Sequence, residues 1–169
     1  MSRVIVVDMT ADAEVDTPMS HPRPTPFRLL LVDDEPMELQ LLRRTLGQMD
    51  TEAELEWAPG GVEALRMLEG APDALPHVIL VDLNMQGMSG IQLLETLVAH
   101  ATLSTIPVMI YSTSSAPHDI DASYARGASC YIVKPFDIAG LEVLFRSILM
   151  FWGRWVAYPT PQRRASTSG

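Results

Sequence analysis

Five polar residues directly follow apolar runs, at the points where the strands of a parallel sheet would end. Asp33 and Asp34 follow the run at 28–32, Asp82 follows 77–81, Ser112 follows 107–111 and Lys134 follows 129–133. Because ligands of an open parallel sheet bind beyond the carboxyl ends of its strands, we expect these side chains to meet at one edge. Three clustered carboxylates repel one another unless a cation lies among them.

The residue types at this edge indicate a particular chemistry. A small set of hard oxygen ligands, with room left for water, is typical of a Mg²⁺ site that also takes a phosphate. A carboxylate beside such an ion, with a hydroxyl and an ammonium to hold anionic oxygens, is suited to capture a phosphoryl group by nucleophilic attack. The sequence therefore predicts Mg²⁺-dependent phosphoryl chemistry at this edge.

The segments around these residues alternate between strand and helix patterns. The predicted strands lie at 28–32, 53–58, 77–81, 107–111 and 129–133, and the helices begin near Pro36, Val62, Gly90, Pro117 and Asp137. This alternation is typical of an α/β fold, in which helices cover both faces of a doubly wound parallel sheet, here of five strands. The segment 53–58 alternates Leu and Trp with Glu, which indicates an exposed edge strand.

The last helix is predicted to run to about Val156. Its apolar residues at helical spacing form a core stripe, made of Leu141, Leu144, Phe145, Ile148, Trp152 and Trp155. Val143, Met150 and Phe151 fall outside this stripe. They leave more apolar surface than the outer helix of a monomer needs, which favours a self-complementary contact between two copies.

Composition restricts the class of protein. The chain has 169 residues, a net charge of −9, a pI near 4.7 and one cysteine. This length suits one domain, which we place at 27–157 between an N-terminal tail at 1–26 and a C-terminal tail at 158–169. The acidic balance argues against nucleic acid as a partner, and the most apolar stretch is too interrupted by charge to span a membrane. The single cysteine excludes a disulfide framework and fits a cytoplasmic protein.

Four stretches of the sequence carry a resemblance to a known family. They are LLLVDDEP (Leu29–Pro36), VILVDLNMQGMSG (Val78–Gly90), PVMIYSTS (Pro107–Ser114) and GASCYIVKPF (Gly127–Phe136). Taken together and in this order, they resemble the receiver domain of response regulators, the module of two-component signalling. The resemblance implies the flavodoxin-like strand order 2-1-3-4-5. Lys134, the only lysine in the chain, stands where this family places its lysine.

The resemblance implies a role for each residue at the strand ends. Asp82 would accept a phosphoryl group from a phosphohistidine of a sensor histidine kinase, with Mg²⁺ as cofactor. Asp34, Asp82 and the backbone carbonyl of Asn84 would bind the ion, and Asp33 would help to position it. Lys134 would pair with a phosphoryl oxygen and would be joined to Pro135 by a cis peptide bond. Ser112 would bond to the phosphoryl group, and Tyr131 would act as a switch that turns inward as Ser112 moves.

Two residues depart from the usual pattern of the family. Gln86 stands where the family commonly has a proline, and together with Gly87 it predicts a looser loop after Asp82. Thr113 is bulkier than the alanine or glycine that is common beside the hydroxyl residue, so we expect it to restrict water and slow dephosphorylation.

The last residues of the chain indicate which kind of response regulator the sequence resembles. The residues after Lys134 suffice for one helix and a tail, so we expect a stand-alone receiver without a DNA-binding domain. The aromatic ending from Phe151 to Pro159 is similar to the single-domain regulators that partner bacterial phytochromes. That likeness implies a phytochrome-type kinase as partner, and a homodimer formed through the fourth helix, the fifth strand and the fifth helix.

Two other hypotheses for the function of the same residues stay open. A degenerate receiver could serve as a scaffold, although its acids, hydroxyl and lysine are intact. A phosphatase of the haloacid-dehalogenase type also uses Asp, Ser or Thr, Lys and Mg²⁺, but its nucleophile lies in an Asp-x-Asp motif, whereas Asp33 and Asp34 are adjacent here. We expect a phosphoacceptor that takes part in its own phosphorylation and dephosphorylation, and not an enzyme with a separate substrate.

Overall fold

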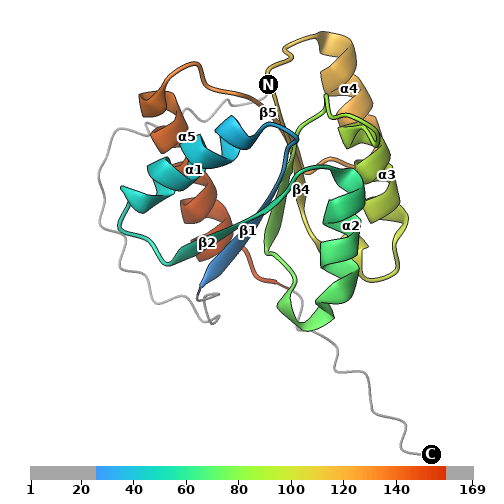
Figure 1. Cartoon of the computed structure of the whole chain (residues 1–169), viewed down its shortest axis with the longest axis horizontal. Coiled ribbons are helices and arrows are strands. Elements are labelled where there is room, and N and C mark those ends of the chain that lie inside the picture. The colour runs from blue at the N-terminus through green and yellow to red at the C-terminus, as the bar shows by residue number, and fades with distance from the viewer. Residues whose placement is uncertain (1–25, 159–169) are drawn as a thin grey trace, which may run out of the picture.

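The computed structural model describes residues 26–158, in which helices flank a five-stranded parallel sheet (Figure 1). The strands are β1 (Phe27–Val32), β2 (Ala53–Ala58), β3 (Val78–Val81), β4 (Val108–Ser112) and β5 (Cys130–Val133). The helices are α1 (Pro36–Gly47), α2 (Gly61–Gly70), α3 (Gly90–Ala99), α4 (Pro117–Ala125) and α5 (Ile138–Met150), with short helical turns η1 (Pro72–Ala74), η2 (Leu103–Thr105) and η3 (Phe151–Trp155). The strand order β2-β1-β3-β4-β5 confirms the predicted fold and the place of β2 at an edge.

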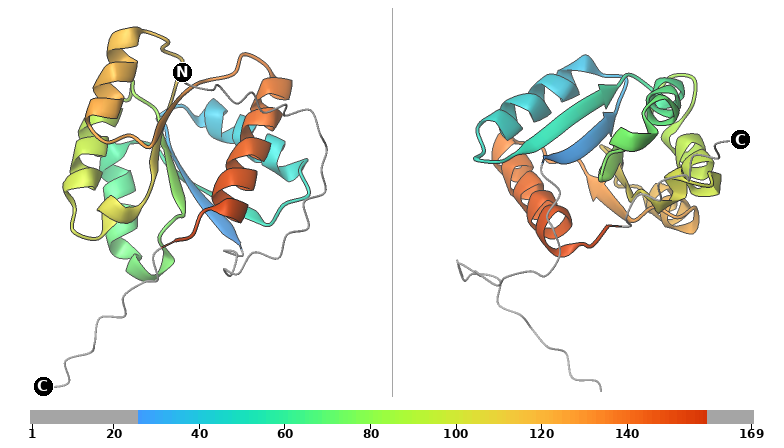
Figure 2. Two further views of the ribbon diagram at one scale, coloured as in Figure 1. Left: turned by 180° about the vertical axis from the view of Figure 1, so that it is seen from behind. Right: turned by 90° about the horizontal axis from the view of Figure 1, so that it is seen from below.

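The helices form two layers, with α1 and α5 on one face of the sheet and α2, α3 and α4 on the other (Figure 2). The central strand β1 shows why both layers are needed. Leu29 and Leu31 pack with the residues of α1 and α5, whereas Leu30 and Val32 pack with those of α2 and α3. All four side chains are buried, as expected of a strand that is covered on both faces. Because every strand is parallel, all the carboxyl ends lie at one edge of the sheet, called the rim below.

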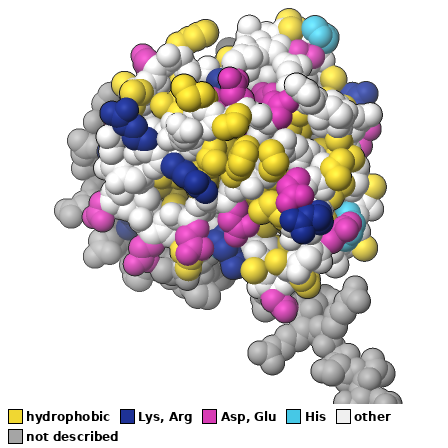
Figure 3. All heavy atoms as spheres, viewed as in Figure 1, with side chains coloured by type: hydrophobic (Ala, Val, Ile, Leu, Met, Phe, Trp, Pro, Cys, Tyr) yellow, Lys and Arg dark blue, Asp and Glu magenta, His cyan; other side chains and the backbone are white. Residues whose placement is uncertain are grey.

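Strands β2 and β5 are the two edges of the sheet, and the exposed residues of β2 include charged side chains. Glu54 and Glu56 are exposed and alternate with the half-buried Leu55 and Trp57. Figure 3 shows acidic side chains spread between hydrophobic ones on the face where β2 crosses in front. Charged side chains on an edge strand hinder its pairing with another chain, so the acids of β2 protect this edge.

Capping residues fix the starts of α3 and α5, the helices that follow the loops after β3 and β5. The Ser89 hydroxyl accepts a hydrogen bond from the Gln92 N–H, and the Gln92 side chain accepts one from the Ser89 N–H, which makes a capping box at α3. At α5, the Asp137 carboxylate accepts the N–H of Gly140 at 2.7 Å. Both caps set where the chain leaves the rim and re-enters a helix.

The end of α5 corrects one expectation. Leu141, Phe145 and Ile148 are buried as predicted, but the α-helix stops at Met150 and continues as the π-helical turn η3. A π turn holds more residues than an α turn, so the phase of the stripe shifts. Trp155 therefore leaves the core and is 47% exposed.

The apolar residues outside the stripe are exposed as the spacing predicted. Val143, Met150 and Phe151 each show more than half of their surface to solvent. The Phe151 ring makes an edge contact with the neighbouring Trp152, with 5.3 Å between the ring centroids.

An aromatic stack covers the end of the sheet opposite the rim, where the strands begin. The His77 ring stacks on Phe27, with 5.2 Å between centroids, and Tyr158 meets His77 edge-on at 5.0 Å. The Tyr158 hydroxyl donates to the Trp152 carbonyl at 2.7 Å, so a residue that we had placed in the C-terminal tail packs against the domain. Within the described segment, no helix combines the length and the hydropathy needed to cross a membrane.

Candidate functional site

The rim brings together the charged residues that end β1, β3 and β5. Asp33 directly follows β1, Asp82 follows β3 and Lys134 follows β5. The Lys134 ammonium donates to Asp33 Oδ2 at 2.7 Å and lies 3.5 Å from Asp82 Oδ1. The predicted convergence of these three side chains at one edge is therefore present in the structure.

Asp82 is oriented by its own loop. Its Oδ2 atom accepts the N–H of Asn84 at 2.9 Å, while its Oδ1 atom faces the ammonium of Lys134. Burial raises the pKa of the Asp82 carboxyl, and the charge of Lys134 and the Asn84 N–H oppose that rise. The residue keeps 8% of its surface exposed, so one carboxylate is aimed at the rim with limited access to solvent.

Lys134 is held mainly by Asp33. Burial alone would lower the pKa of the ammonium, but the hydrogen bond and the charge of Asp33 raise it above the ordinary lysine value. Asp33 is itself fixed, because its Oδ1 atom accepts the N–H of Glu35 at 2.8 Å and its carbonyl accepts the indole N–H of Trp57 at 2.8 Å. The lysine is therefore a charged group with a defined direction.

Asp34 lies at the same rim and is bonded to the loop after β3. Its Oδ2 atom accepts the N–H of Gln86 at 2.9 Å, a bond that a proline at position 86 could not make. The departure from the family pattern thus joins the loop that carries Asp34 to the loop that carries Asn84. Among residues 26–158, no three acidic, histidine or cysteine side chains stand in a ready-made metal-binding group. Instead, the carboxylates of Asp33, Asp34 and Asp82 accept hydrogen bonds from backbone N–H groups, and Lys134 pairs with Asp33 and Asp82.

Ser112, Tyr131 and Pro135 lie around the same rim. Ser112 is fully buried, its hydroxyl oxygen accepts the Ser114 N–H at 3.3 Å, and its carbonyl accepts the Lys134 N–H at 2.8 Å. Tyr131 is half-buried against the core, and its hydroxyl donates to the Ser114 carbonyl at 2.9 Å. The side chain of Pro135 is half-buried beside the start of α5.

Sequence reasoning missed two residues of this site, Glu38 and Tyr111. Glu38 lies on the first turn of α1, with Oε2 3.9 Å from the Lys134 ammonium. The Tyr111 hydroxyl donates to Glu38 Oε1 at 2.8 Å, and Lys134 lies over the Tyr111 ring. Burial and the charge of Glu38 raise the pKa of Tyr111. The sequence did contain a signal for Tyr111, since it is a phenol within an otherwise apolar strand. A buried phenol hydroxyl needs a hydrogen-bond partner, which predicts a polar group nearby.

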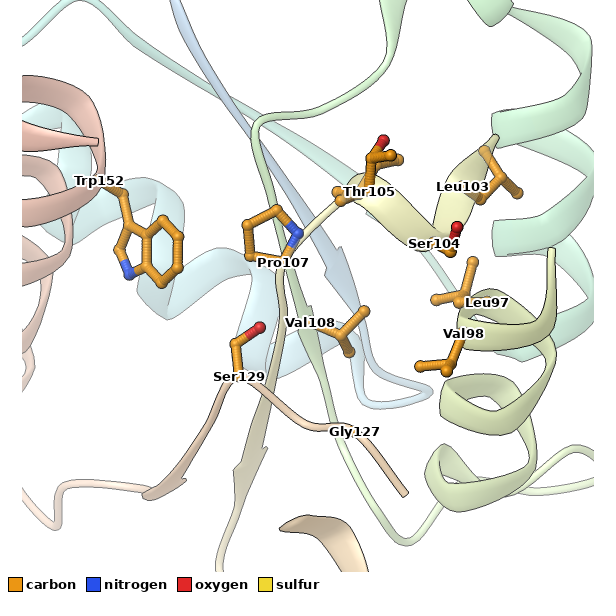
Figure 4. A pocket seen from close by; sticks show the side chains of 11 residues that line it. Leu97, Val98, Leu103, Ser104, Thr105, Pro107, Val108, Gly127, Ser129 and Trp152 are labelled. Atoms are coloured by element: carbon orange, nitrogen blue, oxygen red, sulfur yellow. The ribbon is translucent and has the colours of Figure 1, made fainter. Parts of the chain in front are cut away.

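One pocket of the described residues lies away from the rim. It has a volume of about 190 Å³ and is lined from α3, the loops before β4 and β5, and Trp152 (Figure 4). Val108 begins β4 and Pro107 precedes it, whereas Ser112 ends the strand, so the pocket is at the amino end of the strands. Its lining in the described part of the chain carries no charged side chain, and we assign the chemistry to the rim.

Together, the fold and the rim define a receiver-type domain: a 2-1-3-4-5 sheet with an acidic pair after β1, an aspartate after β3 and a lysine after β5. The chain matches the response regulator receiver domain over residues 29–146, and it belongs to that family, which acts in two-component signalling.

Relatives of known name agree with this assignment. The chain is 29% identical to the response regulator Rcp1 of Synechocystis sp., over 83% of this chain and 99% of that protein. The solved structure of the phosphorylated cyanobacterial phytochrome response regulator RcpA matches with a TM-score of 0.72 and 29% identity, over 79% of this chain and 98% of that one. The structure of RPA3017, a response regulator in red light signalling of R. palustris, matches with a TM-score of 0.73 and 27% identity, over 79% and 98% of the two chains. Rcp1 has also been solved in an Mn²⁺-bound form, with a TM-score of 0.70, 28% identity and coverage of 80% and 100%.

Proposed function

We propose that this protein is a stand-alone response regulator that accepts a phosphoryl group on Asp82 from a phytochrome-type sensor histidine kinase. The observation that carries the proposal is the Asp82 carboxylate, which is oriented by Asn84 and lies 3.5 Å from the only lysine of the chain. In the transfer, an Asp82 oxygen attacks phosphorus, a P–O bond forms, and the P–N bond to the kinase histidine breaks. The electron pair of that bond returns to the imidazole.

Mg²⁺ suits the donor set of the rim. Asp34, Asp82 and the carbonyl of Asn84 would hold the ion, with Asp33 orienting it, and all four supply hard oxygen atoms. The Mn²⁺-bound form of Rcp1 supports a divalent metal as cofactor. When bound, the ion would neutralise charge on the transferring phosphoryl oxygens. Lys134 would pair with one of those oxygens, and the Ser112 hydroxyl would donate to another.

The switch role of Tyr131 is part of the same proposal. Its hydroxyl is bonded to the Ser114 carbonyl, two residues after Ser112. A shift of Ser112 towards a phosphoryl group would move this loop and with it the partner of Tyr131. The change at Asp82 would thereby reach α4 and β5, because the Tyr131 N–H donates to the Tyr124 hydroxyl on α4 at 3.2 Å.

The surface beside the rim supports docking of a kinase. Met37 on the first turn of α1 is 69% exposed, and the Phe136 side chain, two residues after Lys134, is fully exposed. Apolar side chains that flank a reactive carboxylate suit a protein partner that must bring its phosphohistidine to Asp82. RcpA is a phytochrome response regulator and RPA3017 belongs to red light signalling, so the likeness to both supports a kinase of the phytochrome type. The single cysteine suits a cytoplasmic protein.

A homodimer through α4, β5 and α5 completes the proposal. Tyr124 on α4, Val133 on β5 and Val143 on α5 all expose large apolar surfaces, as do Met150 and Phe151 at the end of α5. Removing a large apolar side chain from water is worth roughly 1.5–3 kcal/mol, so contact between two copies would stabilise this face.

Light scattering at micromolar concentration tests the dimer. The double variant Met150→Glu, Phe151→Glu should be a monomer. Met37→Glu, which changes a still more exposed methionine on α1, should remain a dimer like the wild type. A monomeric wild type, or a dimer unaffected by the double change, would contradict the proposed interface.

Phosphorylation by acetyl phosphate, followed by intact-protein mass spectrometry, tests the acceptor. We expect one acid-labile phosphate in the presence of Mg²⁺, none after chelation and none in Asp82→Asn. Asp73→Asn, the same substitution at an exposed position on η1, should label normally. Labelling of Asp82→Asn would assign the phosphate to another residue.

Phosphotransfer from a panel of histidine kinases then tests the partner, with the fastest transfer expected from a phytochrome-type kinase. Steady release of phosphate from many equivalents of a small phosphate ester would instead favour the phosphatase alternative, which the family match does not support.

A further inference from the structure

The Lys134 ammonium faces three carboxylates, and the proposed function uses only two of them. Asp33 lies at 2.7 Å, Asp82 at 3.5 Å and Glu38 at 3.9 Å. Asp33 and Asp82 belong to the acidic set at the strand ends. Glu38 comes from α1, and neither the metal site nor the phosphoacceptor requires it.

Glu38 is held in a fixed direction by Tyr111. The Tyr111 hydroxyl donates to Glu38 Oε1 at 2.8 Å, which leaves Oε2 on the side of Lys134. Tyr111 is 1% exposed at the end of β4, so packing of its ring fixes the position of this hydroxyl. The Lys134 ammonium also lies 5.0 Å from the centre of the Tyr111 ring, within the range of a cation–π contact. Tyr111 thus supports Lys134 both directly and through Glu38.

The other two carboxylates have competing tasks. In the proposed function Asp33 orients the Mg²⁺ and Asp82 becomes an acyl phosphate, so both give up part of their interaction with the ammonium. The Lys134 side chain is only 12% exposed, and a buried charge that loses its partner is costly. Until a phosphoryl oxygen becomes its partner, a lysine in that state would move towards solvent unless another group held it at the rim.

We propose that Glu38 and Tyr111 are positioning residues that keep the Lys134 ammonium at the rim while Asp33 and Asp82 serve the metal and the phosphoryl group. The inference rests on the proposed function. It assigns to the chain a Glu–Tyr–Lys relay, defined as Glu38, Tyr111 and Lys134, in which Glu38 and Tyr111 lie behind the acidic set and do not touch the reacting atoms. Glu38 and Tyr111 are not catalytic residues, because each acts only by holding the Lys134 ammonium in place.

The single lysine makes this relay measurable. Protein grown with lysine labelled with ¹³C at Cε gives the signal of Lys134 alone, so NMR relaxation reports the mobility of this one side chain. The test variants are Glu38→Gln, Tyr111→Phe and the double variant. The matched control is Glu35→Gln, which removes the same charge from the neighbouring exposed position, where the side chain is not near Lys134. Circular dichroism checks that each variant is folded.

We expect a rigid Lys134 signal in the Mg²⁺-saturated wild type and in Glu35→Gln, and a mobile one in all three test variants. The rate of phosphorylation by acetyl phosphate should fall about five- to tenfold in each test variant, as loss of one charge-assisted bond predicts. The double variant should be little slower than either single one, because the two residues act as a unit.

Equal Lys134 mobility in Glu38→Gln and Glu35→Gln would overturn the relay, even if the wild type is phosphorylated normally. A wild type that takes no phosphate would overturn the proposed function instead, and the mobility of Lys134 would still decide the relay. Additive losses in the double variant would also contradict it, since independent effects do not make a relay.

Discussion

The two ends of the sheet are held together by different interactions. At the carboxyl end, Lys134 lies 2.7 Å from Asp33 and 3.5 Å from Asp82, so one ammonium holds side chains that repel each other. At the amino end, His77 contacts the rings of Phe27 and Tyr158, and its Nδ1 atom accepts the backbone N–H of Arg28 at 2.9 Å. The carboxyl end is arranged for chemistry and depends on ions, whereas the amino end closes the domain by packing.

This difference predicts that changes at the rim act through backbone position and ions, and that changes at the aromatic end act mainly through stability and pH. The pocket beside Trp152 belongs to the second kind of surface, since its lining among the described residues is uncharged. The experiments below separate the two ends, beginning with the largest effect.

Gly90→Ala should cause the largest loss of stability. A Cβ at position 90 would lie 2.9 Å from Leu83 Cα and would also meet the carbonyl oxygen of Asp82. Backbone atoms cannot turn aside as a side chain can, so we expect the free energy of unfolding in urea to fall by about 3 kcal/mol. Gly70→Ala is the control: a Cβ there meets no atom within 4 Å, and the change should be within about 1 kcal/mol of the wild type. Equal stability of the two variants would show that the rim backbone adapts freely.

Mg²⁺ should stabilise the rim and leave the aromatic end unaffected. At ten times its dissociation constant, a ligand that binds only the folded state adds about 1.4 kcal/mol, which a thermal melt would detect. We expect this increase in the wild type and in His77→Gln, and expect Asp34→Asn to lose it. An undiminished increase in Asp34→Asn would mean that the ion binds elsewhere.

Gln86→Pro should weaken Mg²⁺ binding by about threefold, because it removes the N–H that fixes Asp34 Oδ2 at 2.9 Å. Gln86→Ala keeps the N–H and should bind like the wild type. Titration followed by the fluorescence of Trp57, whose indole is bonded to the Asp33 carbonyl, gives both affinities, with Trp57→Phe to identify the signal. If Gln86→Pro binds as tightly as Gln86→Ala, the bond to Asp34 does not organise the site.

His77 should give the smallest effect, a pH dependence at the aromatic end. Burial and the charge of Arg28 lower the pKa of His77 below 6.5, so the unfolded chain takes up a proton first as the pH falls. The contribution of neutral His77 to stability is therefore complete above pH 6.5 and is lost as the pH falls through the lowered value. Urea unfolding between pH 7.5 and pH 5.5 should show a steeper loss in the wild type than in His77→Gln, by an amount on the order of 1 kcal/mol or less. Parallel curves for the two proteins would show that His77 does not titrate in this range.

The sequence was sufficient for the fold and for the polar residues at the strand ends. Apolar runs and caps located each strand within a residue or two, because a parallel strand covered on both faces must be apolar throughout. The acids, the hydroxyl and the lysine could be assigned to one rim, since parallel strands end on the same side. The end of α5 was harder, because the π turn that exposes Trp155 leaves no clear sign in the spacing of apolar residues.

Contacts between distant elements needed the tertiary structure. The Tyr111 hydroxyl meets Glu38 across 73 positions of the chain, and the Gln86 N–H meets Asp34 across 52. Hydrophobic periodicity reports which face of a strand or helix is buried, and it carries no information about which polar atoms pair once the elements pack. The sequence alone therefore determined that a charged rim exists and which residues end its strands. Only the packing of α1 on the face of the sheet that carries Tyr111 decided that a glutamate and a buried phenol stand behind its single lysine.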